Sequence, residues 1–269
     1  MITGATELLV HIGDPIAQAR APMLVNPLLD RQGRNAILVP MHVTSDHLGR
    51  ALDGVRATQN IRGGIITMPH KVAVANLADE LTLEAQALGA CNVIQRDRGG
   101  RITGSMLDGE GFVAGLAVAG TSVCGKQVFL AGAGGVALGI AFALAKHGAA
   151  GIAVFNRSPE RTEALRDKIG AAFPEVQIRI LPAPDPSGCD IAINATALGM
   201  KVNDPVPMQI EQLTPSMVAA EVVISDEPTP FLAAATMRGC RIQPGLAMLE
   251  AQIGLMITFM LGALPAHPS

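Results

Sequence analysis

A glycine-rich turn between two apolar segments carries the clearest chemical signal in this sequence. An apolar run at 128–131 precedes the turn and a second one at 151–155 follows it. The turn consists of Gly132, Ala133, Gly134, Gly135, Val136 and Ala137. This G-x-G-x-x-A spacing is a form of the dinucleotide fingerprint: the glycines permit a tight turn and close approach of a pyrophosphate, and the free N–H groups of the next helix attract the phosphates. The turn therefore predicts a dinucleotide site, and the alternative is a glycine-rich turn of an ordinary α/β domain.

The residues after the second apolar run bear on which dinucleotide is bound. NAD sites usually have Asp or Glu there, about twenty residues after the glycines, to hold the ribose 2′-hydroxyl. This chain has Asn156, Arg157 and Ser158 instead, with Arg161 one short turn later. Because the planar guanidinium of Arg pairs with phosphate oxygens, NADP is favoured. Arg157 is equally compatible with a solvated charge at the end of a strand, and NAD stays open.

Three polar side chains outside the turn could act on a substrate. Lys71 is expected in the first turn of a helix, where the helix dipole disfavours a cation and would lower the pKa of an amine, as a general base requires. The alternative for Lys71 is a solvated surface lysine. Asp108 precedes a helical segment at 109–119 and is either an N-cap or a functional carboxylate. Gln252 lies in the apolar helix expected at 246–261 and is either a hydrogen-bonded core amide or a ligand contact.

The elements that must position these residues alternate between strand and helix. Before the glycine-rich turn, strands are expected at 7–12, 38–43 and 61–67, helices at 23–30, 48–57, from 67 onward and 83–88, and a hairpin at 89–94 and 101–106. After the second apolar run, strands are expected at 176–181, 189–196, 217–224 and 239–243, before the helix at 246–261. This alternation predicts the α/β class.

Composition predicts a globular protein with a small-molecule ligand. The chain has 269 residues, 49% of them hydrophobic, which is enough for one large domain or two ordinary ones. Its 20 basic and 23 acidic residues give a formal net charge of −3 without a dense basic block, so neither nucleic acid nor a membrane is an expected partner. The four scattered cysteines have no metal-site spacing, so no metal is expected. No signal-like segment or unbroken membrane-length apolar run is visible, so a soluble cytoplasmic protein is expected.

Six separated motifs, taken in order, resemble those of the shikimate dehydrogenase family along essentially the whole chain. They are Gly13-Asp14-Pro15 with Pro22 and Asn26, the segment from Gly64 to Lys71, Ala90-Cys91-Asn92-Val93, the segment from Gly104 to Gly109, Asn194-Ala195-Thr196 with Gly199, and Gly245 to Leu249 with Gln252. No single motif is specific, but their order and spacing are.

The resemblance implies two α/β domains facing each other across a cleft. A substrate-binding domain would span 1–107 and be completed by 244–269, and a Rossmann NAD(P)-binding domain would span 108–243. Lys71 and Asp108 would be the catalytic pair that moves the proton while hydride passes between the nicotinamide and a ring hydroxyl of a cyclic polyol or hydroxy acid. The implied substrate positions are Ala19, Ala21, Thr67, Asn92 and Gln252. The implied cofactor positions are Gly132, Ala133, Gly134, Gly135, Val136, Asn156, Arg157, Ser158, Arg161, Asn194, Ala195, Thr196, Gly245 and Met248.

The chain departs from the family where the substrate carboxylate is usually held. Members made for shikimate, in aromatic amino acid biosynthesis, usually place two serines in the first loop and a tyrosine after the late strand. The matching positions are Ala19, Ala21 and Ile224. Arg20 could compensate, but in an extended segment it would point to the opposite face. An NAD(P)-dependent alcohol dehydrogenase whose best substrate is not shikimate is therefore expected. A separate departure from the family is Glu221, which stands where the family usually has aspartate.

Two other functions stay open, a non-catalytic dinucleotide-binding sensor and an authentic shikimate 3-dehydrogenase. Joint retention of Lys71, Asp108, Asn92 and Gln252 favours an enzyme, because a sensor has no need of them. The sequence determines neither the substrate, nor the choice between NAD and NADP, nor the pathway. It also leaves the oligomeric state open, with a homodimer as one option.

Overall fold

The computed structural model describes residues 2–201 and 203–263, and the contacts of the chain divide it into two compact units. The first unit ends at Leu107 and resumes at Ile253, and the second extends from Asp108 to Gln252. Within the described part of the chain, no helix is both long and apolar enough to cross a membrane.

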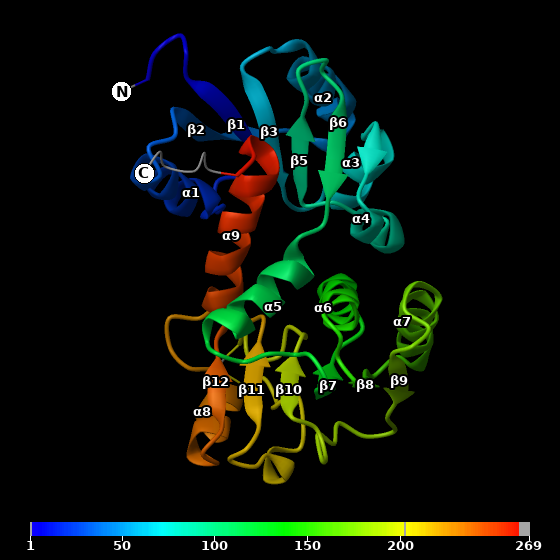
Figure 1. Ribbon diagram of the computed structural model, residues 1–269. Helices are drawn as coiled ribbons and strands as arrows, with labels where there is room; N and C mark the ends of the chain where they lie inside the picture. The colour runs from blue at the N-terminus through cyan, green and yellow to red at the C-terminus, as the bar shows by residue number, and fades with distance from the viewer. Residues whose placement is uncertain (1, 202, 264–269) are drawn as a thin grey trace, which may run out of the picture. The chain divides into compact units, whose positions relative to one another are not determined.

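The first unit is built on a six-stranded sheet with the order β2-β1-β3-β5-β6-β4 (Figure 1). Its elements are β1 (Glu7–Gly13), α1 (Ala21–Arg31), β2 (Ala36–His42), η1 (Ser45–His47), α2 (Leu48–Ala57), β3 (Ile61–Ile66), α3 (Lys71–Leu77), β4 (Glu80–Leu81), α4 (Leu83–Leu88), β5 (Val93–Arg96) and β6 (Ile102–Ser105). β1 pairs in parallel with β2 and β3, and β5 and β6 form the expected antiparallel hairpin. The predicted alternation of strands and helices is thus confirmed.

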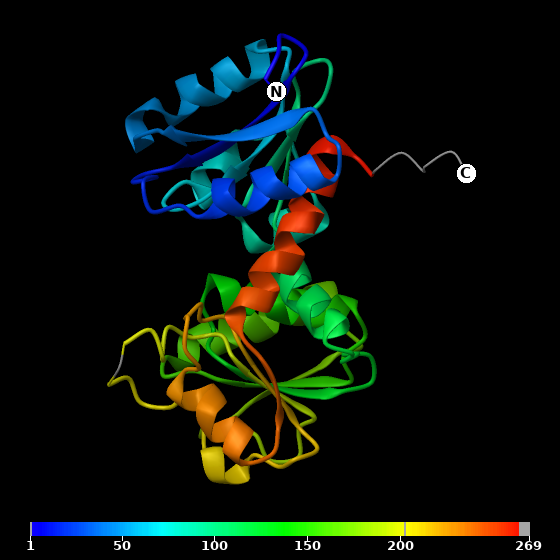
Figure 2. The same cartoon turned by 90° about the vertical axis from the view of Figure 1, so that its left-hand side faces the viewer.

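The side chains of β1 alternate between two faces of this sheet. Val10 and Ile12 pack into a core with Leu52 of α2 and Val74 of α3. Because successive strand residues point to opposite faces, His11 points to the other face. Figure 2 shows α1 and α2 on opposite sides of the sheet. His11 is only 4% exposed, and its Nδ1 has no hydrogen-bond partner among the described residues.

Acid is expected to destabilise the protein through His11. Burial lowers the pKa of its imidazole from 6.5 to about 4. The unfolded chain therefore takes up the proton at a higher pH than the folded chain, and folding stability falls by up to about 3 kcal/mol as the pH drops through this window. Urea unfolding at about pH 7.5 and about pH 4.5 should show a smaller loss in His11→Leu than in the wild type.

A matched control for His11 is available at an exposed histidine. His47 lies at the end of η1 and is solvent-exposed. The His47→Gln variant should keep the wild-type pH dependence of stability. An equal pH dependence in His11→Leu and the wild type would show that the His11 ring titrates alike in the folded and unfolded chain.

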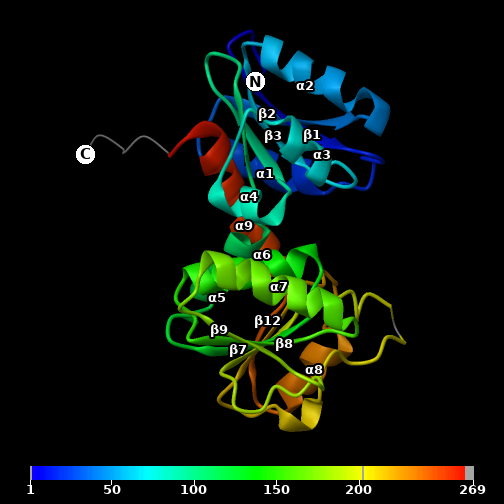
Figure 3. The ribbon, with the colours of Figure 1, turned by 90° about the vertical axis from the view of Figure 1, so that its right-hand side faces the viewer.

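The second unit is a parallel six-stranded sheet with the order β12-β11-β10-β7-β8-β9. Its elements are α5 (Asp108–Val118), β7 (Gln127–Ala131), α6 (Gly135–Lys146), β8 (Gly151–Phe155), α7 (Pro159–Ala172), β9 (Gln177–Ile180), β10 (Ile191–Asn194), η2 (Ile210–Gln212), β11 (Val218–Glu221), α8 (Pro230–Met237), β12 (Arg241–Gln243) and the start of α9 (Gly245–Leu261). Figure 3 shows α6 and α7 over one face of the sheet and α8 over the other. The strand order reverses between β7 and β10, which is the switch point of a Rossmann fold.

The start of α9 packs against α5 through glycines. A Cβ added at Gly111 would lie 2.6 Å from Gln252 Cβ, and one at Gly115 would lie 3.1 Å from the carbonyl oxygen of Ala247. The chain from 245 to 252 therefore groups with the second unit, whereas the sequence placed the return to the first domain at 244. The two positions differ because this contact between helices cannot be read from the apolar pattern of α9.

Gly109 permits an equally close approach of α5 to α6. A Cβ at this position would lie 2.0 Å from the carbonyl oxygen of Gly139 in α6. Gly109→Ala is therefore expected to force the helices apart and to lower the free energy of unfolding by about 1–3 kcal/mol, as overpacking does. Denaturant unfolding measures the loss. Gly54→Ala in α2 is the control, because an added Cβ there meets no atom within 4 Å; it should be neutral or stabilising, and an equal loss in both variants would contradict the packing argument.

Candidate active site

Several of the residues expected to bind substrate lie at one edge of the first sheet, where β3 ends and β5 begins. β3 ends at Ile66 and the antiparallel β5 begins at Val93, so Thr67 and Asn92 lie at the same edge. The Ile66 N–H donates to the Asn92 carbonyl at 2.8 Å. The buried Asn92 side chain accepts from the Leu107 N–H through Oδ1 at 2.9 Å, which fixes the orientation of the carboxamide.

Lys71 is held beside this edge as the first residue of α3. Its carbonyl accepts from the Cys91 N–H at 3.0 Å. Burial raises the pKa of the Cys91 thiol to about 12, and the positive charge of Lys71 acts in the opposite direction. The helix was expected from 67 onward, but the turn closed by the His70 N–H and the Thr67 carbonyl precedes it, so Pro69 lies before the helix rather than in its first turn.

The loop after β1 also reaches this edge. A Cβ at Gly13 would lie 2.4 Å from Thr67 Cγ2, so only glycine permits this approach. The Ala19 N–H donates to the Ile16 carbonyl at 3.0 Å and so closes a turn. α1 then begins at Ala21. Arg20 has φ −88° and ψ −14°, which is helical backbone. The extended segment on which the expected direction of Arg20 depended is therefore not present, and strand alternation does not apply to a helical residue.

In the second unit, α5 and α9 bring together Asp108 and Gln252. Gln252 Nε2 donates to Asp108 Oδ1 at 2.6 Å, and the two side chains are 5% and 8% exposed respectively. Gln252 is thus a hydrogen-bonded buried amide whose partner is a candidate catalytic residue. The hydrogen-bonded core amide is thus observed for Gln252, whereas a contact with a ligand stays a prediction. α5 begins at Asp108 itself.

The glycine-rich turn has the geometry that a diphosphate needs. Gly132 has φ +113°, and a Cβ there would lie 2.8 Å from the Ala195 carbonyl oxygen. Gly134 is the N-cap residue that precedes α6 and offers no side-chain hydrogen bond, and an added Cβ at Gly134 or Gly135 meets no atom within 4 Å. The first N–H groups of α6 are therefore accessible to an anion, so these residues fit the phosphates of a dinucleotide.

The polar residues that follow β8 lie next to this turn. The Gly132 N–H donates to the carbonyl of Phe155, the last residue of β8, at 2.8 Å. Asn156 Nδ2 then donates to the Ser158 carbonyl at 3.2 Å. Arg157 and Arg161 are exposed and form no ion pair with another residue in the ranges 2–201 and 203–263.

The remaining predicted cofactor residues lie around the ends of β10 and β11. Asn194 Oδ1 accepts from the N–H of Thr196 at 3.1 Å and from its hydroxyl at 2.7 Å. A Cβ at Gly245 would lie 2.4 Å from the Val223 carbonyl oxygen, so glycine lets the start of α9 approach the segment after β11. Met248 is buried. The sequence did not predict Thr229, whose hydroxyl donates to the buried Glu221 carboxylate. The available signal was Glu221 itself, an acidic residue at the end of an apolar strand.

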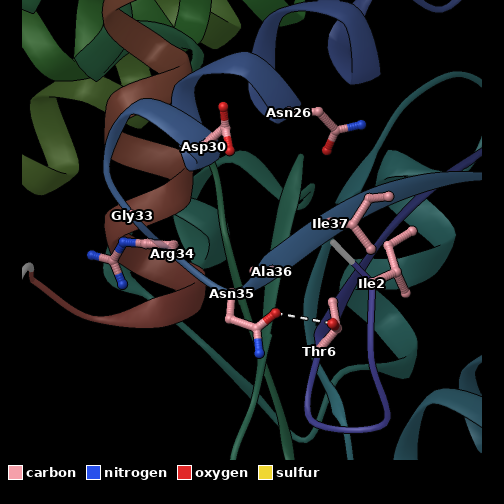
Figure 4. A pocket seen from close by; sticks show the side chains of 9 residues that line it. All are labelled: Ile2, Thr6, Asn26, Asp30, Gly33, Arg34, Asn35, Ala36 and Ile37. Carbon is pink, nitrogen blue, oxygen red and sulfur yellow. Dashed lines mark hydrogen bonds between the residues drawn. The ribbon is translucent and has the colours of Figure 1, made fainter.

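A surface hollow elsewhere in the first unit contains none of the predicted site residues. It encloses about 380 Å³ beside α1 and β2 and is lined by Ile2, Thr6, Asn26, Asp30, Gly33, Arg34, Asn35, Ala36 and Ile37 (Figure 4). Three of its polar side chains are hydrogen-bonded within the fold: the Thr6 hydroxyl donates to Asn35 Oδ1 at 2.9 Å, and Arg34 donates to the Gly262 carbonyl at 2.7 Å.

Comparison with known proteins decides the family. Residues 11–94 match the model of the shikimate dehydrogenase substrate binding domain, and residues 116–203 match that of shikimate / quinate 5-dehydrogenase. A shikimate dehydrogenase (NADP(+)) of Rubrobacter xylanophilus is 35% identical over 254 residues, covering 93% of this chain and 89% of that protein. The chain belongs to the shikimate dehydrogenase family.

Solved structures agree with this membership. A shikimate 5-dehydrogenase of Listeria monocytogenes, in complex with shikimate and NAD, has a TM-score of 0.91 and 28% identity, covering 98% of this chain and 95% of that one. A 5-ketofructose reductase of a Gluconobacter species has a TM-score of 0.89 and 31% identity, covering 96% of this chain and 94% of that one. The predicted family, α/β fold with a Rossmann unit, and NAD(P)-dependent oxidoreductase class are confirmed.

Within this NAD(P)-dependent family, the choice of dinucleotide by this chain can be tested at Arg157. Arg157→Ala is expected to weaken NADP binding by about 1.5–3 kcal/mol, or roughly one to two decades in Kd, because it removes the charge-assisted bond that Arg157 is predicted to make with the 2′-phosphate. NAD, which lacks that phosphate, should bind nearly as before. Fluorescence titration with each dinucleotide gives the ratio of Kd in Arg157→Ala to Kd in the wild type, once for NADP and once for NAD.

Arg166 provides the control for Arg157. It lies in the adjacent α7, is exposed and binds Asp167 at 3.0 Å. Arg166→Ala should change neither affinity. Equal weakening of NAD and NADP in Arg157→Ala would mean that Arg157 does not contact the 2′-phosphate.

Proposed function

We propose that this protein is an NAD(P)-dependent oxidoreductase that interconverts a neutral polyhydroxylated alcohol and its ketone, and that shikimate is not its best substrate. The observation that carries the proposal is the loss of three hydroxyl donors, at Ala19, Ala21 and Ile224. An anionic carboxylate needs charge-assisted or hydroxyl hydrogen bonds to replace its lost hydration. The side chains at these three positions are methyl and butyl groups, which suit an uncharged substrate end.

The likeness to the 5-ketofructose reductase supports this substrate class. The name of that protein specifies a keto sugar, which has hydroxyl and carbonyl groups but no carboxylate. A second candidate is shikimate itself, which is favoured by the relative from Rubrobacter and by the structure from Listeria that holds shikimate. The two candidates differ in the charge of the substrate, which makes them separable by assay.

The proposed chemistry assigns one task to each retained polar residue. The nicotinamide ring supplies or accepts the hydride. Lys71 exchanges a proton with the oxygen at the reacting carbon, and Asp108 orients that hydroxyl or carbonyl group. Gln252 holds one oxygen of the Asp108 carboxylate through its 2.6 Å bond. Asn92 and Thr67 bind further hydroxyl groups of the substrate.

Cofactor binding is assigned to the second unit. The turn Gly132-Ala133-Gly134-Gly135-Val136 would receive the diphosphate at the start of α6, where the accessible N–H groups fit it. Arg157 and Arg161 would bind the adenosine 2′-phosphate of NADP. The loop of Asn194, Ala195 and Thr196, together with Gly245 and Met248, would contact the rest of the dinucleotide.

The test is a parallel screen of neutral and anionic substrates. Cyclic polyols, keto sugars, shikimate and quinate should be assayed with NAD and NADP, and with the reduced cofactors for ketones. The highest kcat/KM is expected for a neutral compound. A preference for shikimate or quinate would reject the neutral substrate class, and dinucleotide binding without turnover of any compound would favour the sensor.

A further inference from the structure

A buried carboxylate joins two loops at the carboxyl edge of the parallel sheet. Glu221 ends β11 and pairs in register with Asn194, which ends β10. The Glu221 side chain is 1% exposed, and Asn194 is fully buried. Both residues lie on the side of the switch point opposite to β8, since β10 and β11 lie on one side of β7 in the sheet and β8 lies on the other.

The hydrogen bonds of Glu221 come from neutral side chains. The Thr229 hydroxyl donates to the carboxylate, at 2.9 Å from Oε1 and 3.0 Å from Oε2. Asn194 Nδ2 lies 3.4 Å from Oε2 and donates to the Leu198 carbonyl at 2.9 Å. No cationic side chain within residues 2–201 and 203–263 forms an ion pair with Glu221, and burial raises the pKa of its carboxyl group. Burying an acid in this way costs solvation energy that an apolar side chain would avoid.

Glu221 connects two segments through these bonds. On one side, Asn194 organises the loop that follows β10, because its Oδ1 binds both the N–H and the hydroxyl of Thr196. On the other side, Thr229 is the last residue of the segment 222–229, which follows β11 and contains Ile224. The Thr229 hydroxyl also accepts from the Leu232 N–H at 3.3 Å and so caps α8. One buried carboxylate thus fixes the ends of both segments.

The position of these segments relates them to one half of the cofactor. A dinucleotide bound to a Rossmann fold spans the switch point, with its adenosine half over the strand that follows the glycine turn. That strand is β8, whose end carries Arg157. The nicotinamide half therefore extends over the ends of β10 and β11, where the loops joined by Glu221 lie.

We infer that Glu221 is a positioning residue for the nicotinamide half of the cofactor, acting through Asn194 and Thr229 on the two loops that receive it. The inference rests on the proposed use of a nicotinamide dinucleotide and is independent of which alcohol or ketone is the substrate. It is distinct from a contact role, because the carboxylate is buried beneath the loops.

The test compares a whole dinucleotide with its adenosine half. In Glu221→Gln one carbonyl oxygen remains to accept from the Thr229 hydroxyl, but an NH2 group replaces the oxygen that faces Asn194 Nδ2, so the bond to Asn194 is lost. NADP is expected to bind about tenfold more weakly, the size of one lost buried hydrogen bond. The affinity for 2′,5′-ADP, which contains only the adenosine half, should stay within about twofold. ADP replaces 2′,5′-ADP if the wild-type protein binds NAD more tightly.

Changes at Thr229 separate its hydroxyl from its shape. Thr229→Val removes the donor to Glu221 and should weaken NADP as Glu221→Gln does, while the double variant should be no weaker than either single one. Thr229→Ser retains the hydroxyl and should bind both ligands like the wild type. Thr236→Val is the control in the same helix, because its hydroxyl bonds only within α8.

Two results would overturn the inference. Equal weakening of NADP and 2′,5′-ADP in Glu221→Gln would show that the residue only stabilises the second unit as a whole. Unchanged NADP affinity would show that the loops do not depend on it. Retained 2′,5′-ADP binding also proves that each variant is folded, and failure of the wild-type protein to bind any dinucleotide would reject the proposed function together with this inference.

Discussion

Replacing Lys71 by alanine is expected to lower kcat by about 10²–10⁴-fold, the range that general acid–base catalysis provides. The reason is that hydride transfer to or from a carbon requires a proton to move at the attached oxygen, and Lys71 is the residue proposed to move it. Dinucleotide affinity should stay nearly unchanged, because the proposed cofactor residues lie in the second unit and Lys71 lies in the first. Steady-state kinetics and a separate binding titration measure the two quantities.

A Lys71→Arg variant distinguishes proton transfer from charge. Arginine keeps the positive charge but does not give up its proton in the working pH range, so this variant should be nearly as slow as Lys71→Ala. Lys168→Ala, at an exposed position in α7, is the control and should keep full activity. Recovery of most activity in Lys71→Arg would show that only the charge matters, and a parallel loss of cofactor binding would show that Lys71 is structural.

Wild-type kcat/KM on shikimate is expected to be two to four decades below that of an enzyme with the usual carboxylate site. A hydrogen bond to a charged group is worth roughly 1.5–3 kcal/mol. The loss of even two hydroxyl donors at Ala19, Ala21 and Ile224 would therefore cost about 3–6 kcal/mol in the transition state. The measurement is kcat/KM on shikimate beside that on the best neutral substrate of the screen.

The double change Ala19→Ser with Ala21→Ser tests the cause of this loss. It should raise kcat/KM on shikimate by at least about tenfold, since it restores two donors, and should leave the neutral substrate unimproved. Ala114→Ser in α5 serves as a control, because it adds a hydroxyl outside the predicted substrate positions. Wild-type turnover of shikimate at about 10⁴ M⁻¹s⁻¹ or above would contradict the argument, as that is the rate of a competent enzyme.

A further variant tests whether Arg20 binds the substrate carboxylate. Because its backbone is helical, the alternation rule no longer places its side chain away from Ala19 and Ala21. Adding Arg20→Ala to the double serine variant would show whether its guanidinium contributes to anion binding. The expected result is that part of the gain in kcat/KM on shikimate is lost, with no change on the neutral substrate, since a neutral substrate offers no charge for the guanidinium to bind.

Local patterns in the sequence determined the elements and the order of the motifs. The glycine-rich turn could be recognised because the requirement for φ +113° at Gly132 and for an open approach at Gly134 is a property of a few consecutive residues. The hairpin of β5 and β6 was likewise evident from two apolar runs separated by a turn. The spacing of apolar residues indicates which side of an element is buried. The turn and the hairpin depend on residues that are close together in the sequence.

The tertiary structure alone decided which distant residues meet. Asp108 and Gln252 are 144 positions apart, and their hydrogen bond exists because glycines let α5 and α9 approach closely. The link from Glu221 to Asn194 likewise depends on the neighbouring places of β10 and β11 in the sheet. Such contacts follow from packing and topology, whereas a hydrophobic pattern carries information only about the element in which it lies.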